Sequence, residues 1–579
     1  MDRKNIIRIL GEIATLLELK GENPFKVRAY LNAARALETM EDFEDCVECG
    51  TLAETPGLGK ALCEKITTLH LTGELEYYEK LQASVAPGLL EMLEISGLGG
   101  KKIKALRDAL GVETIESLQQ VCKEGRVAEL KGFGAKSQDN ILEGIKNRER
   151  YNARHLWWRA RSIAMPLLAD LRAMPEVELA ELAGSFRRRL ETVGDLDFIA
   201  ASAEPKPIMD RFVSMKGVNE VTAKGDTKSS VRLTHGMQAD LRVVPREQFY
   251  FTLHHFTGSK DHNVQMRQRA LSRSLSLSEW GLSVVEGKSP VEKPPASIAD
   301  EEELFDALGL AYVPPELREG RGEIEAAEQG ALPELFDLAD LRGVFHCHTT
   351  ASDGSDRVED LLASADARGW DYVGISDHSK ASYQANGLDE SRLLSQIDEI
   401  DEINASGKFH AYAFSGIECD VLPDGSLDLT DDALAKVDFV IVSVHSSFSQ
   451  SEEEMTARIV KAMEHPCVTM LGHLSGRLLL RREPYAVNVD KIIDAAVANG
   501  KIIEINANPM RLDMDWRHWR KATAKGVLAS INPDAHDTSH FDFCEAGSHV
   551  ARKGWLTRDD VLNTRSLKEV RKFLSTGCF

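Results

Sequence analysis

The strongest constraint on this fold is a regular alternation of short apolar strands and helical segments that begins near residue 340. Apolar runs recur near residues 344, 373, 414, 440, 468, 502 and 528, and most of the segments between them have helix-forming composition. Because neighbouring parallel strands need a crossover connection, this alternation indicates a sheet of parallel strands. Seven such units predict a closed or nearly closed (β/α)7 barrel.

Candidate metal ligands stand at or just past the ends of these strands. They are His346, His348, Asp353, His378, Glu418, His445, His473, Asp534 and His536. The carboxyl ends of the strands meet at one mouth of a parallel barrel, so we expect these side chains to converge there. A single His at a strand end is ordinarily a core or surface residue, but so many in one register favour a metal centre. Mixed imidazole and carboxylate ligation suits Zn, Mn or Fe.

Residues 336–579, approximately, resemble the polymerase and histidinol phosphatase (PHP) domain. The resemblance is carried by a series of motifs in this order: H-x-H, SDG, SDH, E, H, GH and D-x-H. The resemblance implies a phosphoesterase with a cluster of up to three Mn²⁺ and/or Zn²⁺ ions. It assigns one ion to His346, His348, Glu418 and Asp534, a second to Asp353, His378 and His536, and a third to Glu418, His445 and His473, with Glu418 bridging. Such a cluster activates water and neutralises phosphate. We therefore expect His346, His348 and His445 to be catalytic.

The middle of the chain has two acidic residues two positions apart, Asp195 and Asp197, in the segment DLDFIA. Side chains alternate across a strand, so both carboxylates should share one face, and Asp240 in QADLRVV can join them from a neighbouring strand. Such carboxylates repel one another unless divalent cations neutralise them. Two ions can clamp the attacking and leaving oxygens of a phosphoryl transfer. We therefore predict a Mg²⁺ or Mn²⁺ site with Asp195, Asp197 and Asp240 as ligands and catalytic residues.

A Gly-Ser turn into a short helix precedes these carboxylates, and its N–H groups are expected to hold a triphosphate. The string GSFRRRLETVGDLD and the later string HFTGSKDHNVQMR resemble family X DNA polymerases. The resemblance assigns nucleotide binding to Gly184, Ser185, Arg188, Gly194, His255, Phe256, Gly258, Asn263 and Arg267. Animal members typically have Tyr in place of His255 and Arg in place of Gln238. Both departures leave sugar selection and the charge balance of the carboxylates open.

Residues 1–150 are predicted to be helical and contain a Gly-x-Gly turn three times. The glycines are Gly57 and Gly59, Gly97 and Gly99, and Gly132 and Gly134. These turns resemble helix-hairpin-helix motifs, in which glycine lets the backbone approach a phosphate that helix N–H groups then bind without reading bases. Lys65, in the first such helix, matches a Schiff-base lysine of some family X lyase domains. The alternative, a lysine that only binds phosphate, is the interpretation we favour.

The chain is thus predicted to be multidomain, α+β followed by α/β. The expected order is a helical lyase-like domain (1–85), helix-hairpin-helix fingers (86–150), a nucleotidyltransferase palm (151–245), a thumb (246–318), a linker (319–335) and the PHP domain (336–579). This order resembles bacterial polymerase X. It implies gap-filling DNA synthesis in base excision repair, with Mn-dependent 3′–5′ exonuclease and, as further candidates, abasic-site endonuclease or 3′-phosphatase activity. Two alternatives stay open: a 3′-end-processing nuclease or phosphatase whose polymerase half only positions DNA, and a non-catalytic repair scaffold.

Most of the net charge of −22 falls in residues 301–579, so the front half can present a basic face to phosphates. The acidic half either holds divalent cations or is a solvated surface. No apolar run approaches the ~18–20 residues that span a bilayer. We expect a cytoplasmic monomer that uses gapped or primed DNA and dNTPs. Four arginines are open to two interpretations, DNA contacts or plain surface charges: Arg477, Arg481, Arg482 and Arg511.

Overall fold

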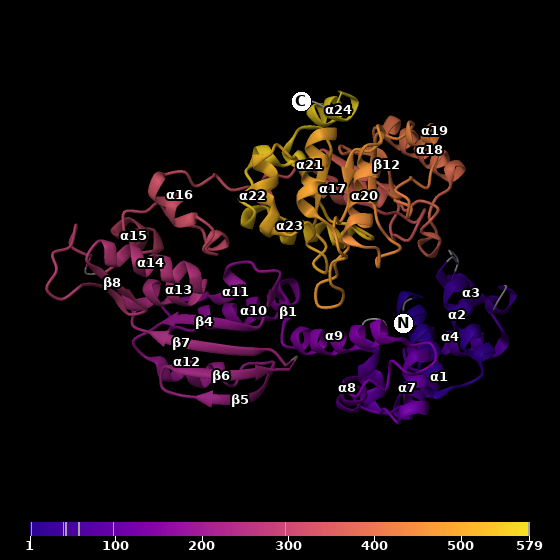
Figure 1. The fold of residues 1–579 in the computed structure, drawn as a ribbon, viewed down its shortest axis with the longest axis horizontal. Coiled ribbons are helices and arrows are strands. Elements are labelled where there is room, and N and C mark those ends of the chain that lie inside the picture. Colours follow the sequence, from indigo (N-terminus) through magenta and orange to yellow (C-terminus); the bar gives the residue numbers. More distant parts are fainter. Residues whose placement is uncertain are drawn as a thin grey trace. The chain divides into compact units, whose positions relative to one another are not determined.

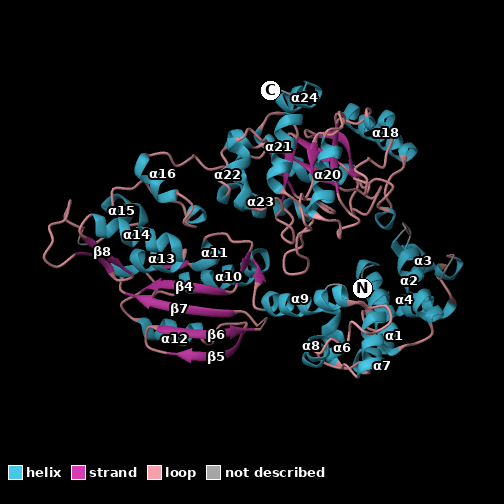
Figure 2. Ribbon diagram, in the orientation of Figure 1, coloured by secondary structure: helices cyan, strands magenta, loops and turns pink. Residues whose placement is uncertain are grey.

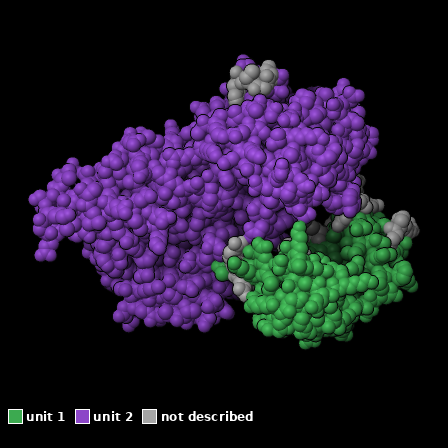
Figure 3. Space-filling view, viewed as in Figure 1, with its two compact units in different colours: residues 1–153 green, residues 154–579 purple. Residues whose placement is uncertain are grey.

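A computed structural model describes residues 1, 3–38, 40, 43–55, 58–95, 98–234, 236–295 and 297–576 (Figures 1 and 2). They form two compact units, residues 1–153 and residues 154–579 (Figure 3). Each unit has its own hydrophobic core. Within the described residues, every helix is too short or too polar to cross a bilayer.

The first unit is helical, as predicted. Its helices are α1 (Arg3–Lys20), α2 (Pro24–Glu38), α3 (Phe43–Cys49), α4 (Lys60–Thr72), α5 (Glu76–Ala83), α6 (Pro87–Glu91), α7 (Gly100–Leu110), α8 (Ile115–Lys123) and α9 (Ala135–Asn152). Helix α1 packs against α2, α4, α5 and α7. Its buried residues Ile6, Leu10, Ile13 and Leu17 follow the three-to-four-residue spacing of one helix face, which explains why it sits at the centre.

The second unit begins with a five-stranded sheet in the order β2-β4-β7-β6-β5. The strands are β2 (Leu179–Leu182), β4 (Asp195–Ala201), β5 (Val218–Lys224), β6 (Lys228–Leu233) and β7 (Gln238–Val244). Strands β4 and β7 are parallel neighbours, and the other pairs are antiparallel. Leu196 and Phe198 share a core with helices α10 (Trp157–Arg172) and α12 (Pro205–Phe212). Ile199 packs with Phe249 of α13 (Phe249–Thr257) on the opposite face, so the side chains of the strand alternate between faces as predicted.

Short elements complete the palm and thumb. They are β1 (His155–Leu156), α11 (Gly184–Arg187), β3 (Thr192–Val193), α14 (Lys260–Ser272), β8 (Leu275–Ser278), β9 (Gly281–Val284), α15 (Glu301–Ala307) and α16 (Glu323–Gln329). Helix α16 lies in the segment 319–335 that we predicted to be a linker. Its Ile324 and Ala327 join the thumb core, and its fully buried Glu323 lies 2.9 Å from His262 Nδ1. This segment is therefore an ordered extension of the thumb, because one face of its helix is buried.

The last part is the predicted barrel of seven parallel strands, which follow one another in sequence order. They are β10 (Gly343–Cys347), β11 (Tyr372–Ile375), β12 (Tyr412–Asp420), β13 (Phe439–Ser443), β14 (Met470–Leu471), β15 (Ile502–Asn506) and β16 (Ala529–Asn532). Beyond β16, Ala535 N donates to His346 O (3.0 Å) and His348 N donates to Ala535 O (2.7 Å). These bonds return the last strand to the first, so the barrel is nearly closed.

Helices connect and cover these strands (Figure 2). They are α17 (Val358–Ala367), α18 (Glu390–Ser406), α19 (Asp431–Leu434), α20 (Glu452–Met463), α21 (Val489–Asn499), α22 (Trp516–Ala524), α23 (Cys544–Lys553) and α24 (Leu567–Thr576). Apolar residues of strands and helices form one large core, and a second cluster that includes Phe345, Phe414 and Phe439 packs on the other face of the strands, since parallel strands are buried on both faces. The ligand candidates stand above this core.

Candidate metal centres and nucleotide cradle

Three carboxylates lie on one face of the palm sheet. The β4–β7 register places Asp197 directly opposite Asp240, with Asp195 on the same face of β4. Burial, and then the charges of Asp195 and Asp240, raise the pKa of Asp197 to about 7. Burial acts to raise the pKa of Asp240 as well, but hydrogen bonds from Gln238 and Lys228, each at 3.0 Å, lower it. Asp197 has no such cationic neighbour at ion-pair distance among the described residues, so this corner fits divalent cations.

The Gly184 turn lies directly against these carboxylates. Gly184 is buried with φ +61, and a Cβ at this position would lie 2.5 Å from Asp197 Oδ2. Only glycine combines the left-handed backbone with this close approach. Ala183 N donates to Asp197 O at 2.8 Å, which fixes α11 at the end of the strand. The predicted triphosphate cradle therefore adjoins the predicted cation site.

Arg188, the basic residue predicted for that cradle, is held by the thumb. Its Nε lies 3.1 Å from Glu319 Oε1, and its guanidinium also donates to Thr257 O. A Cβ at Gly258 would lie 3.2 Å from Arg188 Nη1, so that glycine keeps the thumb backbone close. The guanidinium is thereby fixed in orientation at the end of the short helix.

The other residues predicted for the nucleotide pocket divide into two groups. Asn263 is buried and donates its Nδ2 to His255 O at 2.7 Å, while Phe256 stacks under the guanidinium of Arg242 at 4.2 Å. Half-exposed His255 has its Nδ1 3.9 Å from Glu279 Oε2. Arg267 lies on the exposed face of α14 and makes none of these contacts. The structure thus brings His255 and Asn263 together but leaves Arg267 on the surface.

The barrel mouth collects all nine predicted ligands into overlapping groups of potential metal-binding atoms. Glu418 lies at their centre. Its Oε1 is 2.9 Å from His473 Nε2 and 3.3 Å from both His346 Nε2 and His445 Nε2. Its Oε2 is 2.8 Å from His378 Nδ1. This placement suits the bridging role that the resemblance implied.

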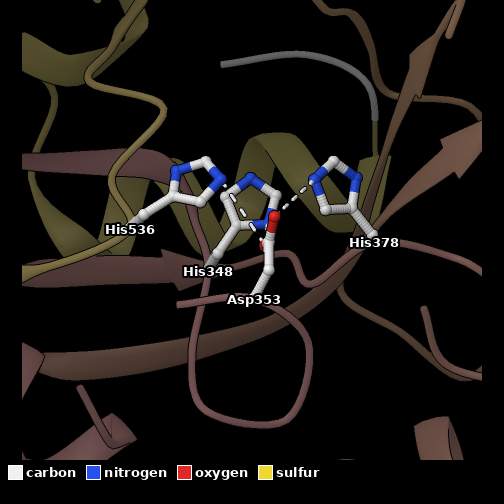
Figure 4. A group of neighbouring side chains, drawn as sticks. All are labelled: His348, Asp353, His378 and His536. Carbon is white, nitrogen blue, oxygen red and sulfur yellow. Dashed lines mark ion pairs between the residues drawn. The ribbon is translucent and has the colours of Figure 1, made fainter. Parts of the chain in front are cut away.

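A second group surrounds Asp353, and Figure 4 shows its members pointing toward one another. Asp353 lies 3.5 Å from His536, 3.7 Å from His378 and 3.9 Å from His348, measured from carboxylate oxygen to ring nitrogen. His348 also has its Nε2 3.4 Å from Asp534 Oδ1. The distances therefore place His348 between two predicted ion sites rather than in one alone.

The donor atoms of this mouth fit bound metal ions. His346 Nε2 and both ring nitrogens of His348 are buried, and within the described residues none of them has a hydrogen-bond partner. A buried unpaired polar atom costs about 1–3 kcal/mol, and coordination to a cation supplies the missing partner. His346 and Asp534 also have positive φ values, 58° and 52°, a strained backbone of the kind that clusters at functional sites.

Two further carboxylates orient the imidazoles from behind. Glu504 Oε2 lies 2.6 Å from His346 Nδ1, and Asp420 Oδ1 lies 3.1 Å from His445 Nδ1. An imidazole held at Nδ1 presents Nε2 to a metal, which is the usual arrangement around metal-ligating histidines. Sequence alone did not indicate Glu504 or Asp420. The available signals were the lone carboxylate of Glu504 in IIEIN and, in GIECD, a second carboxylate two residues after Glu418.

The groups at the mouth also hold protons in the absence of cations. Burial acts to lower the pKa of His445, but the carboxylates of Glu418 and Asp420 raise it to about 10. Burial acts to raise the pKa of Glu418, yet the neighbouring His445 and His378 bring it well below its usual range. Cations that bind here therefore displace protons from imidazoles.

The arginines near this mouth have structural partners. Arg477 is buried, pairs with Asp515 at 2.6 Å and donates to Arg511 O at 2.8 Å, so it is neither a surface charge nor free to bind DNA. Arg511 itself has its Nε 3.3 Å from Asp534 Oδ2. Arg482 donates to a backbone carbonyl, and Arg481 is exposed.

The Gly-x-Gly turns of the first unit precede helices as predicted. Gly59 and Gly99 are the N-caps of α4 and α7, and Gly134 directly precedes α9. A Cβ at Gly59, Gly99, Gly132 or Gly134 would meet no described atom within 4 Å, so a phosphate has room to approach. Gly57 and Gly97 lie outside the described residues. Lys65 Nζ lies 4.7 Å from the centroid of the Tyr77 ring and 5.6 Å from that of Tyr30.

Comparisons with known proteins identify the domains that carry these sites. Family profiles match residues 1–75 (helix-hairpin-helix domain), 89–147 (SAM-like helix-hairpin-helix tandem), 252–319 (DNA polymerase beta thumb) and 345–508 (PHP domain). DNA polymerase lambda of Arabidopsis thaliana is 24% identical over 54% of this chain and 62% of its own. A probable phosphatase of Thermoanaerobacter sp. (strain X514) is 30% identical over 28% of this chain and 66% of its own.

One relative matches from end to end. The DNA polymerase/3′–5′ exonuclease PolX of Bacillus subtilis (strain 168) is 40% identical over 99% of this chain and 99% of its own. The predicted resemblance, fold class and potential metal-binding cluster are thereby confirmed. The chain belongs to the bacterial PolX family of DNA polymerase/3′–5′ exonucleases.

Proposed function

We propose that this protein extends DNA primers with dNTPs at the palm and removes 3′-terminal nucleotides at the barrel mouth, filling short gaps during base excision repair. The observation that carries the proposal is the presence of two separate sets of cation-binding groups in one chain. Asp195, Asp197 and Asp240 form the first, and the nine residues around Glu418 form the second.

At the palm, Asp195, Asp197 and Asp240 would hold Mg²⁺ or Mn²⁺. When bound, these cations neutralise the charge that develops on the transferred phosphate. The N–H groups after Gly184 and the guanidinium of Arg188 bind the triphosphate and keep it in place. Asp240 orients the 3′-hydroxyl of the primer. The reaction is therefore mostly positioning of two charged reactants.

At the barrel mouth, the nine ligands would hold Mn²⁺ and/or Zn²⁺, which act as Lewis acids on a phosphodiester when bound. Glu504 and Asp420 orient His346 and His445, so that the ring nitrogens face the substrate side. The same geometry supports hydrolysis at an abasic site or of a 3′-phosphate. We propose Mn²⁺-dependent exonuclease as the main activity of this site.

Two double variants test the division of labour on the same gapped, 5′-labelled DNA. Asp195→Ala/Asp197→Ala should lose extension and keep degradation, whereas His346→Ala/His348→Ala should do the reverse. Extension and degradation are compared on three substrates: a one-nucleotide gap, a longer gap and an open primer–template. Each reaction is run separately with Mg²⁺, Mn²⁺ and Zn²⁺. Size-exclusion chromatography with light scattering checks the proposed monomer.

The alternatives predict different results. If wild-type protein degrades DNA but never extends it, the palm only positions DNA. If it does neither with any of the three metals, the scaffold interpretation holds. Loss of both activities in one folded double variant would contradict the two-site proposal.

A further inference from the structure

A cationic pocket lies between the thumb extension and the barrel, outside both metal centres. Its volume is about 280 Å³, and its lining consists of cationic and tryptophan side chains: Arg321, Trp516, Arg517, Arg520, Lys521, Lys553 and Trp555. Four of these stand on α22, and Arg321 lies two residues before the start of α16. Arg520 Nη1 donates to Arg321 O at 2.7 Å, which joins the two walls. No carboxylate contributes to the lining.

The positive charge of the pocket is only partly neutralised. Lys553 pairs with Glu319 at 2.7 Å, Lys521 with Asp490 at 2.6 Å, and Arg517 with Asp515 and Glu191. In the described part of the chain, neither Arg321 nor Arg520 has a carboxylate within ion-pair distance. Both are exposed, and each contributes a planar guanidinium with several free donors. Two guanidinium groups without a carboxylate partner leave the pocket with positive charge that favours an anion.

The aromatic rings indicate which part of a ligand would be held. Trp516 already has Arg517 at 4.4 Å, Lys553 at 4.5 Å and Arg321 at 5.2 Å from its ring centroid. Arg520 lies 3.8 Å from the ring of Trp555. Cations thus cover the ring faces on which a nucleobase would stack. The pocket is built for phosphate groups rather than for bases.

We propose that this pocket binds backbone phosphates of a DNA strand at the junction of the thumb extension and the PHP barrel. The proposal rests on the DNA-processing function proposed above. The pocket's arginines Arg517 and Arg520 are exposed on one side of α22, about one turn (~5–6 Å) apart. This spacing suits successive phosphates of a strand more than one compact anion. Arg517 also reaches Glu191, four residues before Asp195, at 3.2 Å, so the pocket adjoins the loop that leads to the palm carboxylates.

The test measures binding of fluorescein-labelled oligo-dT, ~20 nucleotides long, by anisotropy in EDTA over a series of KCl concentrations. In Arg321→Gln/Arg520→Gln, two phosphate contacts are lost. Since each contact contributes about 0.7 to the slope of log K against log salt for single strands, the slope should fall by about 1.4. Affinity at low salt should fall on the order of tenfold. Arg321→Lys/Arg520→Lys keeps both charges and should keep the slope.

The matched control is Arg558→Gln/Arg571→Gln, which removes two exposed barrel arginines outside the pocket. An unchanged slope in the pocket variant, or an equal loss in the control, overturns the proposal. Calorimetry with dTMP tests whether the pocket instead takes free nucleotides. If dTMP binds the wild-type protein but not the pocket variant, and the slope for oligo-dT is the same in both, the assignment to DNA fails. If the double variant melts below wild type, Arg321→Gln alone should give half the slope change. Extension and degradation of short primed DNA are assayed separately, so failure here leaves the two-site function testable.

Discussion

Changing Asp197 to Asn should stabilise the palm when metals are absent. Asp197 is largely buried beside Asp195 and Asp240, and its pKa is raised from 3.8 to about 7. A carboxyl group whose pKa is raised by folding contributes stability at low pH, and that stability is lost as pH rises through the folded pKa. Metal-free wild-type protein should therefore lose stability between about pH 4 and pH 7, whereas the Asn variant has no such titration.

The size of the effect follows from the same pKa. A rise from 3.8 to about 7 corresponds to about 4 kcal/mol at ~1.4 kcal/mol per pH unit. Partial exposure of the side chain to solvent reduces this to about 2 kcal/mol. We expect Asp197→Asn to raise the opening free energy of the palm sheet by about 2 kcal/mol at pH 8, and by under about 1 kcal/mol at pH 5, where wild-type Asp197 is protonated.

Hydrogen exchange by mass spectrometry on peptides from β4 and β7, in EDTA, measures this opening directly. Asp226→Asn, in the exposed turn between β5 and β6, serves as the control and also corrects for the pH dependence of exchange. Adding Mn²⁺ should make the wild-type palm more stable than that of Asp197→Asn. A cation at about 100 times its Kd stabilises the wild-type site by about 2.7 kcal/mol. The reasoning is refuted if Asp197→Asn raises the opening free energy equally at pH 5 and pH 8. It is also refuted if the variant does not raise this free energy in EDTA.

Three further substitutions test the contacts around the two sites. Gly184→Ala places a methyl group against Asp197 Oδ2 at a position with a left-handed backbone. Primer extension should therefore fall at least ~100-fold while exonuclease activity is kept. Equal loss of both activities would contradict this prediction. Glu504→Gln should weaken metal binding at the barrel mouth about 10–100-fold in Mn²⁺ titrations followed by elemental analysis, without affecting extension. Lys553→Met removes one of the two cations that pair with Glu319, leaving Arg188, and also removes the buried ammonium's hydrogen bonds to two backbone carbonyls, so the free energy of unfolding should fall by about 1.5–3 kcal/mol in denaturant titrations.

Local sequence patterns predicted the barrel because a strand buried on both faces is apolar throughout, and such strands stand out from the helices between them. The same logic placed Leu196 and Asp197 on opposite faces of β4. It failed for the segment 319–335, whose Glu, Ala and Gly composition is typical of a spacer. This segment is ordered by burial of Ile324 and Ala327 in the thumb core and by the contact between Glu323 and His262, about 60 positions earlier, which no local pattern contains.

The candidate ligands could be predicted because their positions follow from strand ends, whereas their grouping followed only from the resemblance to the PHP domain. His348 and Asp353 belong to one strand–loop connection, and the path of that loop decides which ion each side chain approaches. The supporting carboxylates Glu504 and Asp420 were missed for a related reason. Each has its role only through a histidine on another strand, so its function exists in the folded structure and not in the local sequence.

The string GSFRRRLETVGDLD shows why a highly specific sequence signal need not be wholly catalytic. Gly184 adjoins the carboxylates, but Arg187 donates to Thr257 and pairs with Glu301 of the thumb. Glu191 turns to the barrel, where Arg517 lies 3.2 Å away and Arg477 3.8 Å away. Different members of one string therefore contact the palm carboxylates, the thumb and the barrel. Because these contacts fall within a few residues of the carboxylates, the thumb and the barrel both help to fix the position of the loop that leads to Asp195.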